Sequence, residues 1–523
     1  MTAQAGNLSH RLKQIPWGNI LMPRLEDILF LAIFLAVIGL GPRLLNMDGD
    51  LGRHLTIGNY ILDNLTIPTR DIFSHTMTGL PLTPHEWLAQ VVFAVSYRVG
   101  GLDGVVVFCA LLIASTFTLV FRQCMAQSKL LLISLALTIL GAAAASIHWL
   151  TRPHLFTMLI TVLWIRELER WRLTGRWRWW VLPLLMLVWV NFHGAFIVGI
   201  LILGIYLIDN LLSNRRFSSK HEPRFSNVDV NTINKMQPRI LILTGIFVLL
   251  MTLVNPVGWR IWGTTFGFLQ SRYLVGHTVE YLPPDFQQIS SWPFLVMISL
   301  SILSASLNPK RSTIAAALLI TSWTIFGLIS ARNFAIYAVI AAPILAGSGS
   351  SFLRVYKGFE RVASFDSRLR VVDSNLFGYI WPLVSILLIA GILYSGANID
   401  FTGTGNRFSE NVFPVEAVDW VSEQSEMGPV FNYFPWGGYL LYRGWPQQQV
   451  FIDGQTDFYG ESLTRQYETV ITLGAGWKGI LDKYHVRWVM MPADAQLIKA
   501  LEGLASWKME YQDEIAAIYY FDP

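Results

Sequence analysis

Apolar runs of about 20 residues recur along this chain from residue 26 to residue 397. An α-helix needs about 20 mainly apolar residues to cross the hydrocarbon core of a bilayer. Only closed barrels and helices satisfy their backbone polar groups in lipid, and runs of this length are typical of helices. The chain is therefore expected to be a polytopic helical membrane protein and not a soluble enzyme with one membrane anchor.

The runs predict about eleven transmembrane helices. Only 14% of the 523 residues are charged, whereas soluble domains carry about a quarter. The run 179–212 is divided into two spans at Asn191–Gly194. The predicted spans are 26–45, 103–122, 129–147, 154–170, 179–192, 194–212, 239–255, 292–308, 312–330, 333–348 and 379–397.

Lys and Arg are distributed unequally between alternate loops. If the N-terminal segment 1–25 is cytoplasmic, the cytoplasmic side carries 23 of the 39 Lys and Arg residues and the outer loops carry eight. Enrichment of Lys and Arg in cytoplasmic loops sets the orientation of membrane proteins. An odd number of spans then places residues 398–523 outside the cytoplasm. The predicted domains are this outer segment, the N-terminal segment and a transmembrane domain, 26–397, with a large outer loop at 46–102.

The outer loop 46–102 concentrates ionisable residues beside the first span. They include Asp48, Asp50, Arg53, His54, His85 and Glu86. Amphipathic spacing at 54–62 and 86–98 predicts two interfacial helices there, as expected for a substrate anchored in the bilayer. No basic face with interleaved aromatics is present, so nucleic acid is not expected as a partner.

Histidine is concentrated on the same side of the membrane. Seven of the ten His residues lie on or beside the outer face, namely His54, His75, His85, His148, His154, His193 and His277. Ionisable groups at membrane depth mark functional cavities, so His154 and His193 join the loop residues as cavity candidates. His and carboxylate side chains also bind divalent metals, which makes Asp48, Asp50 and His85 candidate ligands. No spacing such as HxxxH or HExxH is present, so the sequence alone assigns no cofactor.

This layout resembles the GT-C superfamily of membrane glycosyltransferases, which use polyprenyl-phosphate-linked sugars. The region from Asp48 to Leu88 is similar to the first loop of the protein mannosyltransferase and aminoarabinose transferase branches: acids after the first span, a Pro-Thr-x-Asp turn, then a short polar and aromatic motif. Runs such as Thr151–His154 and Ala331–Asn333 are similar to those of bacterial glycosyltransferase-like proteins. The resemblance implies a bacterial inner-membrane enzyme whose acceptor is a glycan, a lipid or a protein.

The resemblance also implies roles for individual residues. A first-loop acid would act as general base on an acceptor hydroxyl, with inversion at the anomeric carbon. We favour Asp50 over Asp48 because Arg53 and His54 are expected to keep Asp50 ionised, and Glu86 is the reserve candidate. Cationic side chains have to offset the charge of the leaving phosphate.

Two arginines are candidates for this donor-phosphate role. Arg332 is the first, because it opens an apolar span on the outer side. Arg152, which precedes another span, is the second. The planar fork of an arginine matches phosphate oxygens.

Residues 398–523 alternate between strand and helix patterns, which predicts an α/β domain. The predicted strands are 430–433, 450–454, 486–492 and 515–520, and the predicted helices are 414–423, 461–473 and 495–503. Asn432 to Tyr439 is similar to the acceptor-binding motif of oligosaccharyltransferases, without its acid. Trp436 and Tyr439 are therefore candidates for the acceptor side. Asp453, Gln455, Asp457 and Tyr459 are further candidates for a sugar site, because alternating polar groups after a strand project from one rim.

Two other classes of function remain open at this stage. A transporter of lipid-linked saccharides would need polar groups through the whole membrane and usually repeated halves, and neither is evident. A scaffold that binds a partner through its outer domain would not depend on Asp48 or Asp50.

Overall fold

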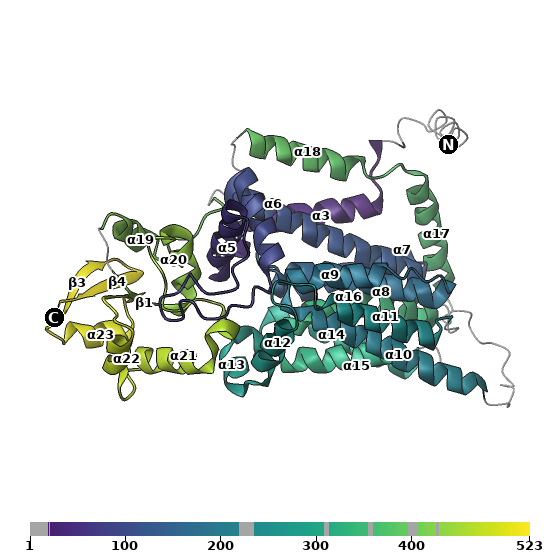
Figure 1. Cartoon of the computed structure of the whole chain (residues 1–523). Helices are drawn as coiled ribbons and strands as arrows, with labels where there is room; N and C mark the ends of the chain where they lie inside the picture. The colour runs from purple at the N-terminus through teal and green to yellow at the C-terminus, as the bar shows by residue number, and fades with distance from the viewer. Residues whose placement is uncertain are drawn as a thin grey trace.

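The computed structural model describes residues 19, 21–218, 235–307, 313–353, 359–395, 405–424 and 428–522. Most of the predicted N-terminal segment 1–25 lies outside these residues. Each of the eleven predicted spans corresponds to a helix, and the C-terminal part is a small α/β domain, which confirms the predicted fold class. In Figure 1 this domain, green to yellow, lies at one end of the helical bundle.

Most of the bundle helices correspond to the predicted spans, whereas the helices at 50–64, 260–270, 272–277 and 359–375 lie between them. The bundle helices are α3 (Leu25–Gly39), α4 (Gly41–Asn46), α5 (Asp50–Asn64), α6 (Trp87–Ser128), α7 (Leu131–Ala145), α8 (His154–Thr174), α9 (Val181–Phe192), α10 (Ile197–Ser218), α11 (Pro238–Met251), α12 (Arg260–Gln270), α13 (Arg272–His277), α14 (Trp292–Leu307), α15 (Ile314–Ile329), α16 (Phe334–Leu353), α17 (Phe359–Asn375) and α18 (Ile380–Tyr394). Within the described residues, five segments are long and apolar enough to cross a membrane singly, or six if the bent pair of α17 and α18 forms one span. Several other spans are shorter apolar helices, so the protein is a polytopic membrane protein.

The two helices predicted in the first outer loop both form, with different surroundings from those expected. The second is continuous with the next span in α6, and the helix is interrupted only at Gly100 and Gly101, where φ is −149° and +59°. The first, α5, begins at Asp50, and residues Asp50 to Gly58 are all buried. It lies against α6 and α20 (Gly437–Gly444) and not on an open surface.

The C-terminal domain contains a four-stranded sheet in the order β1-β2-β4-β3. Its strands are β1 (Val430–Asn432), β2 (Trp488–Pro492), β3 (Trp507–Gln512) and β4 (Ala516–Phe521). β1 and β2 are parallel, whereas β4 is antiparallel to both β2 and β3. Besides α20, its helices are α19 (Val415–Ser422), α21 (Thr456–Ile471), α22 (Trp477–Lys483) and α23 (Gln496–Glu502).

The strand predicted at 450–454 is wrong, and a strand at 507–512 was missed. Phe451 and Ile452 are fully buried, but their backbone bonds with the Asn432 side chain, whose Oδ1 accepts from Phe451 N at 2.8 Å and whose Nδ2 donates to Ile452 O at 2.9 Å. The Asn432 side chain thus makes the backbone hydrogen bonds that a neighbouring strand would otherwise make, and residues 451 and 452 do not form a strand. The missed strand β3 lies at the sheet edge and is largely exposed, so it lacks the apolar signature of a buried strand.

Candidate active site

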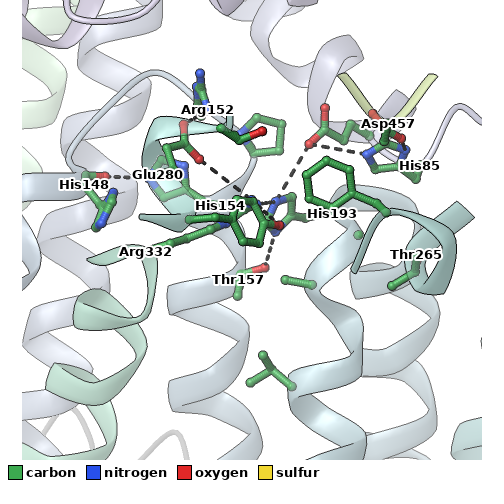
Figure 2. Close-up of a pocket in the computed structure, with 18 of the residues that line it drawn as sticks. His85, His148, Arg152, His154, Thr157, His193, Thr265, Glu280, Arg332 and Asp457 are labelled. Atoms are coloured by element: carbon green, nitrogen blue, oxygen red, sulfur yellow. Dashed lines mark hydrogen bonds and ion pairs between the residues drawn. The ribbon is translucent and has the colours of Figure 1, made fainter. Parts of the chain in front are cut away.

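A cavity of about 370 Å³ lies where the helical bundle meets the C-terminal domain. Its lining comes from segments far apart in the sequence: α5, the two residues before α6, α8 and the loop before it, the α9–α10 junction, α12, the loop after α13, the α15–α16 junction and residues 454–457. Figure 2 shows side chains from these segments converging on one space. Most of the predicted site residues line this cavity, and the exceptions are Asp48, Trp436, Tyr439, Asp453 and Tyr459.

Glycines bring the first outer loop against the C-terminal domain. A Cβ on Gly52 would lie 2.3 Å from the Gly438 carbonyl oxygen, and one on Gly438 would lie 2.2 Å from the Gly49 oxygen. A Cβ on Gly454 would lie only 1.6 Å from Asp50 Oδ1. The absence of a side chain at these positions allows α5, α20 and the 454–457 segment to approach each other closely.

Asp48 and Asp50 share one partner, Arg152. Arg152 Nη2 lies 2.5 Å from Asp48 Oδ1 and 3.0 Å from Asp50 Oδ2. Arg152 Nε also donates to Asp48, and Arg152 Nη1 donates to Glu280. Asp50 lines the cavity, whereas Asp48 does not. Only Asp50 is therefore accessible from the cavity, although the two acids are only two residues apart.

Burial raises the pKa of Asp50 to about 7, because the charged carboxylate loses its hydration, and the Arg53 charge only partly offsets this. The expectation that Arg53 and His54 keep Asp50 ionised is not met. Burial lowers the pKa of His54 well below its usual value, so this ring is neutral. Arg53 bonds with Gln455 Oε1 at 3.1 Å and pairs with Glu86 and Asp453.

Glu86 lies at the centre of a group of basic side chains on the cavity wall. Its carboxylate oxygens are 3.6 Å from Arg53 Nη2, 4.0 Å from His54 Nδ1, and 3.8 Å from the Nε2 atoms of His85 and His193. His85 Nδ1 also lies 3.6 Å from Asp457 of the C-terminal domain. Five of the seven histidines predicted to lie at the outer face, namely His54, His85, His148, His154 and His193, line this one cavity, whereas His75 and His277 do not.

Arg332 reaches the same cavity from the α15–α16 junction. Its Nη1 donates to Tyr281 Oη at 2.7 Å, and its Nη2 lies 3.0 Å from His193 Nε2. The nearest carboxylate is Glu280, at 3.8 Å from Nη1. Two nitrogens of Arg332 thus contact neutral partners, Tyr281 and His193. In Arg152, by contrast, all three guanidinium nitrogens contact carboxylates.

Beyond these polar groups the cavity continues between apolar side chains. They are Met158, Ile197, Val198, Leu201, Phe268, Leu269, Trp323, Phe326 and Ile336. These residues belong to α8, α10, α12, α15 and α16, so the apolar part extends along the spans. A cavity that is polar at one end and apolar along membrane helices suits an amphipathic ligand.

The C-terminal domain contributes Gly454, Gln455, Thr456 and Asp457 to the lining. Asp453, a predicted acceptor residue, lies just behind them, and burial raises its pKa. Trp436 and Tyr439 are not brought to the cavity. They are 4% and 2% exposed and pack within the domain, where Trp436 Nε1 donates to the Val412 oxygen.

The predicted metal ligands do not fit a metal site. Asp48 and Asp50 are held by Arg152, while His85 lies with Glu86 and Asp457. In the described part of the chain, no group of three or more His, Cys, Asp or Glu side chains is free to hold a metal ion, because the acids that come together around Arg152 are bound to its guanidinium. The cation at the two aspartates is the chain's own guanidinium.

Sequence reasoning missed Glu280 and Tyr281, which contact Arg152 and Arg332 respectively. Glu280 could have been predicted as a site residue, because it is an acid in a second predicted outer loop, 259–291, close to the next predicted span.

Comparison with known proteins gives matches by structure alone. No family model matches the chain, and no curated protein matches it significantly. The apo oligosaccharyltransferase of Archaeoglobus fulgidus superposes with a TM-score of 0.53 at 11% identity, over 89% of this chain and 70% of that chain. The same archaeal protein, AglB, in complex with an inhibitory peptide and a dolichol-phosphate gives 0.51 at 11% identity, over 94% and 74%.

ArnT from Cupriavidus metallidurans bound to undecaprenyl phosphate gives a TM-score of 0.47 at 14% identity, over 94% of this chain and 97% of that chain. At these identities the similarity concerns the fold. It shows that this chain shares the overall fold of the archaeal oligosaccharyltransferase, a bundle of membrane helices followed by a C-terminal domain.

Proposed function

We propose that this protein is an inverting glycosyltransferase that moves a sugar from a polyprenyl-phosphate-linked donor to an acceptor at the outer face of the membrane. The observation that carries the proposal is a single cavity with a buried acid, Asp50, an accessible cation, Arg332, and an apolar extension along the spans. The archaeal oligosaccharyltransferase of similar fold was solved with a dolichol-phosphate, which is a ligand of this chemical kind.

The apolar extension would hold the polyprenyl chain, and Arg332 would bind the phosphate. A guanidinium bonded to neutral partners retains its charge for an anionic ligand, and its fork matches two phosphate oxygens. Arg152 is less suited to this role because three carboxylates already occupy its nitrogens. We therefore assign the donor phosphate to Arg332.

Asp50 would accept the proton of the acceptor hydroxyl. The hydroxyl oxygen then attacks the anomeric carbon from the face opposite the phosphate, and the bond between carbon and phosphate oxygen breaks. The electron pair leaves with the polyprenyl phosphate, whose charge Arg332 offsets. Asp50 is favoured over Asp48 because it lines the cavity, while Asp48 is held by Arg152 behind it. The acceptor would bind on the side of Gly454–Asp457, the part of the cavity lining that the C-terminal domain contributes.

The test of the base is transfer by purified Asp50→Asn, Asp48→Asn and Glu86→Gln proteins of equal thermal stability. Undecaprenyl-phosphate-linked sugars serve as donors, cell-envelope extract supplies acceptors, and release of undecaprenyl phosphate is measured by mass spectrometry. Because a general base contributes about 10²- to 10⁴-fold, Asp50→Asn should lose activity by that factor. Full activity in Asp50→Asn removes it from the role, and full activity in all three favours a scaffold.

The same preparations test the phosphate site through binding of undecaprenyl phosphate, measured by native mass spectrometry. Arg332→Ala should bind about 10- to 100-fold more weakly, since a hydrogen bond to a charged group is worth about 1.5–3 kcal/mol. The matched control is Arg98→Ala on α6, because Arg98 pairs with Asp63 outside the cavity. Equal binding by Arg332→Ala and wild type contradicts the assignment.

A further inference from the structure

Arg152 stands out because every nitrogen of its guanidinium contacts a carboxylate. Nε and Nη2 bind both oxygens of Asp48, Nη2 also lies 3.0 Å from Asp50 Oδ2, and Nη1 binds Glu280. The side chains of the three acids are only 9%, 13% and 22% exposed. Three acids so close together and so poorly hydrated require a cation between them.

The position of this cation is fixed by the fold. Next to Arg152, Thr151 Oγ1 donates to the Leu44 oxygen at 3.1 Å, which ties the segment to the end of the first span. Asp48 and Asp50 follow that span directly, and Glu280 enters from the loop before α14. In Figure 2, Arg152 and Glu280 lie next to each other at one edge of the cavity. The guanidinium therefore joins two outer loops at the cavity wall.

A divalent cation would compete for the same oxygens. Carboxylates from several segments are the ligands that Mg²⁺ and Mn²⁺ prefer. Arg152 uses oxygens of all three acids, and its positive charge would repel a metal ion at the same place. The site can hold the guanidinium or a metal, but not both.

We propose that Arg152 is a built-in counter-ion that takes the place of a divalent metal between Asp48, Asp50 and Glu280, so that this site operates without metal. The role of Arg152 in catalysis rests on the proposed function, whereas its place between the three acids does not. Arg152 acts as a positioning residue: it holds Asp50 Oδ2, while Asp50 Oδ1 lies over Gly454 of the cavity lining.

The first test is binding of Mn²⁺ alone to the full-length purified protein, measured as loss of the free Mn²⁺ signal in electron paramagnetic resonance. Wild type should bind no Mn²⁺ at this site. Arg152→Ala removes the guanidinium and leaves the three acids, so it should bind one Mn²⁺ per chain. Adding Glu280→Gln to Arg152→Ala should weaken that binding at least tenfold, because one of the three acids is neutralised.

The matched control is Arg332→Ala, which removes another arginine of the same cavity and leaves Arg152 in place. It should bind no Mn²⁺. If Arg152→Ala does not fold, Arg152→Met keeps most of the hydrocarbon volume without the charge and is expected to bind Mn²⁺ in the same way. Two results overturn the proposal. One is stoichiometric Mn²⁺ binding by the wild type that is lost in the Glu280→Gln variant. The other is the absence of Mn²⁺ binding in a folded Arg152 variant.

The second test is metal dependence of transfer. Treatment with EDTA should leave wild-type activity unchanged, while Arg152→Ala should lose activity and regain part of it with Mn²⁺. A purely structural arginine would give a loss that Mn²⁺ does not restore, and that result counts against the proposal. The Mn²⁺-binding test needs no sugar donor, so it remains decisive if the protein transfers no sugar and the proposed function fails.

Discussion

Two aspartates separated by a single residue occupy chemically different places in this molecule. Asp48 points to Arg152 and is bound through both oxygens, whereas Asp50 shares one oxygen with Arg152 and faces the cavity over Gly454. The difference arises because α5 starts at Asp50, so that Asp48 lies in the turn before the helix and Asp50 on its first turn.

At the residue scale, the surroundings of Asp50 predict a pH profile. Burial raises the Asp50 pKa to about 7, so the carboxyl group is mostly protonated below this pH and could not act there as the proposed base. The kcat/KM for transfer should therefore rise as pH increases from 6 to 8 and level off above 8, since kcat/KM reports groups of the free enzyme. The measurement is the pH dependence of initial rates at low donor concentration.

Glu86→Gln provides the internal check on this profile. The negative charge of Glu86 contributes to the raised pKa of Asp50, so its removal should shift the midpoint of the profile to lower pH. An unchanged midpoint in an active Glu86→Gln protein would show that another group titrates. Complete loss of activity in this variant would instead point to Glu86 as the base.

At the scale of elements, the contact between α5 and α20 decides where Asp50 and Arg53 lie. The two helices meet through Gly49, Gly52 and Gly438, at distances that leave no room for a methyl group. This contact was not predictable from sequence, because the glycines of the two helices are far apart in the chain. A glycine also allows the backbone to turn, so its presence alone does not indicate a close contact between helices.

Gly438→Ala should therefore separate α20 from α5. Its Cβ would lie 2.2 Å from the Gly49 carbonyl oxygen, and backbone atoms cannot move aside as a flexible side chain can. Overpacking of this kind costs about 1–3 kcal/mol, so the thermal unfolding midpoint should fall, and transfer should fall with it as Asp50 moves.

The control for this variant is Gly391→Ala in α18, where no atom lies within 4 Å of the new Cβ. Alanine favours the helix by about 1 kcal/mol over glycine, so this variant should be unchanged or slightly stabilised. Equal unfolding midpoints for the Gly438 and Gly391 variants would refute the close contact.

At the scale of the whole molecule, hydropathy located the eleven spans, because lipid imposes one length and one composition on them, but it did not predict the helices α12, α13 and α17 between them. The outer acids and Arg332 were also found, since ionisable groups near apolar spans are rare. The joining of the bundle to the C-terminal domain could not be predicted. It depends on contacts such as Ser271 Oγ with Glu461 Oε2 at 3.0 Å, and Arg465 over the Tyr273 ring at 3.8 Å. Hydropathy carries no information about such polar pairs.

The orientation of the whole molecule remains a prediction of the charge distribution, and it determines on which side the cavity opens. Glu514 is exposed in the C-terminal domain, and Arg361 is exposed in α17 on the opposite, predicted cytoplasmic side. The native Cys109 and Cys124 are both fully buried, so they should not react with added reagents. A sulfonated maleimide that does not cross membranes should label Glu514→Cys in intact spheroplasts and Arg361→Cys only after lysis. The reverse pattern would place the cavity in the cytoplasm, where the excess of Lys and Arg in the other set of loops would have no explanation.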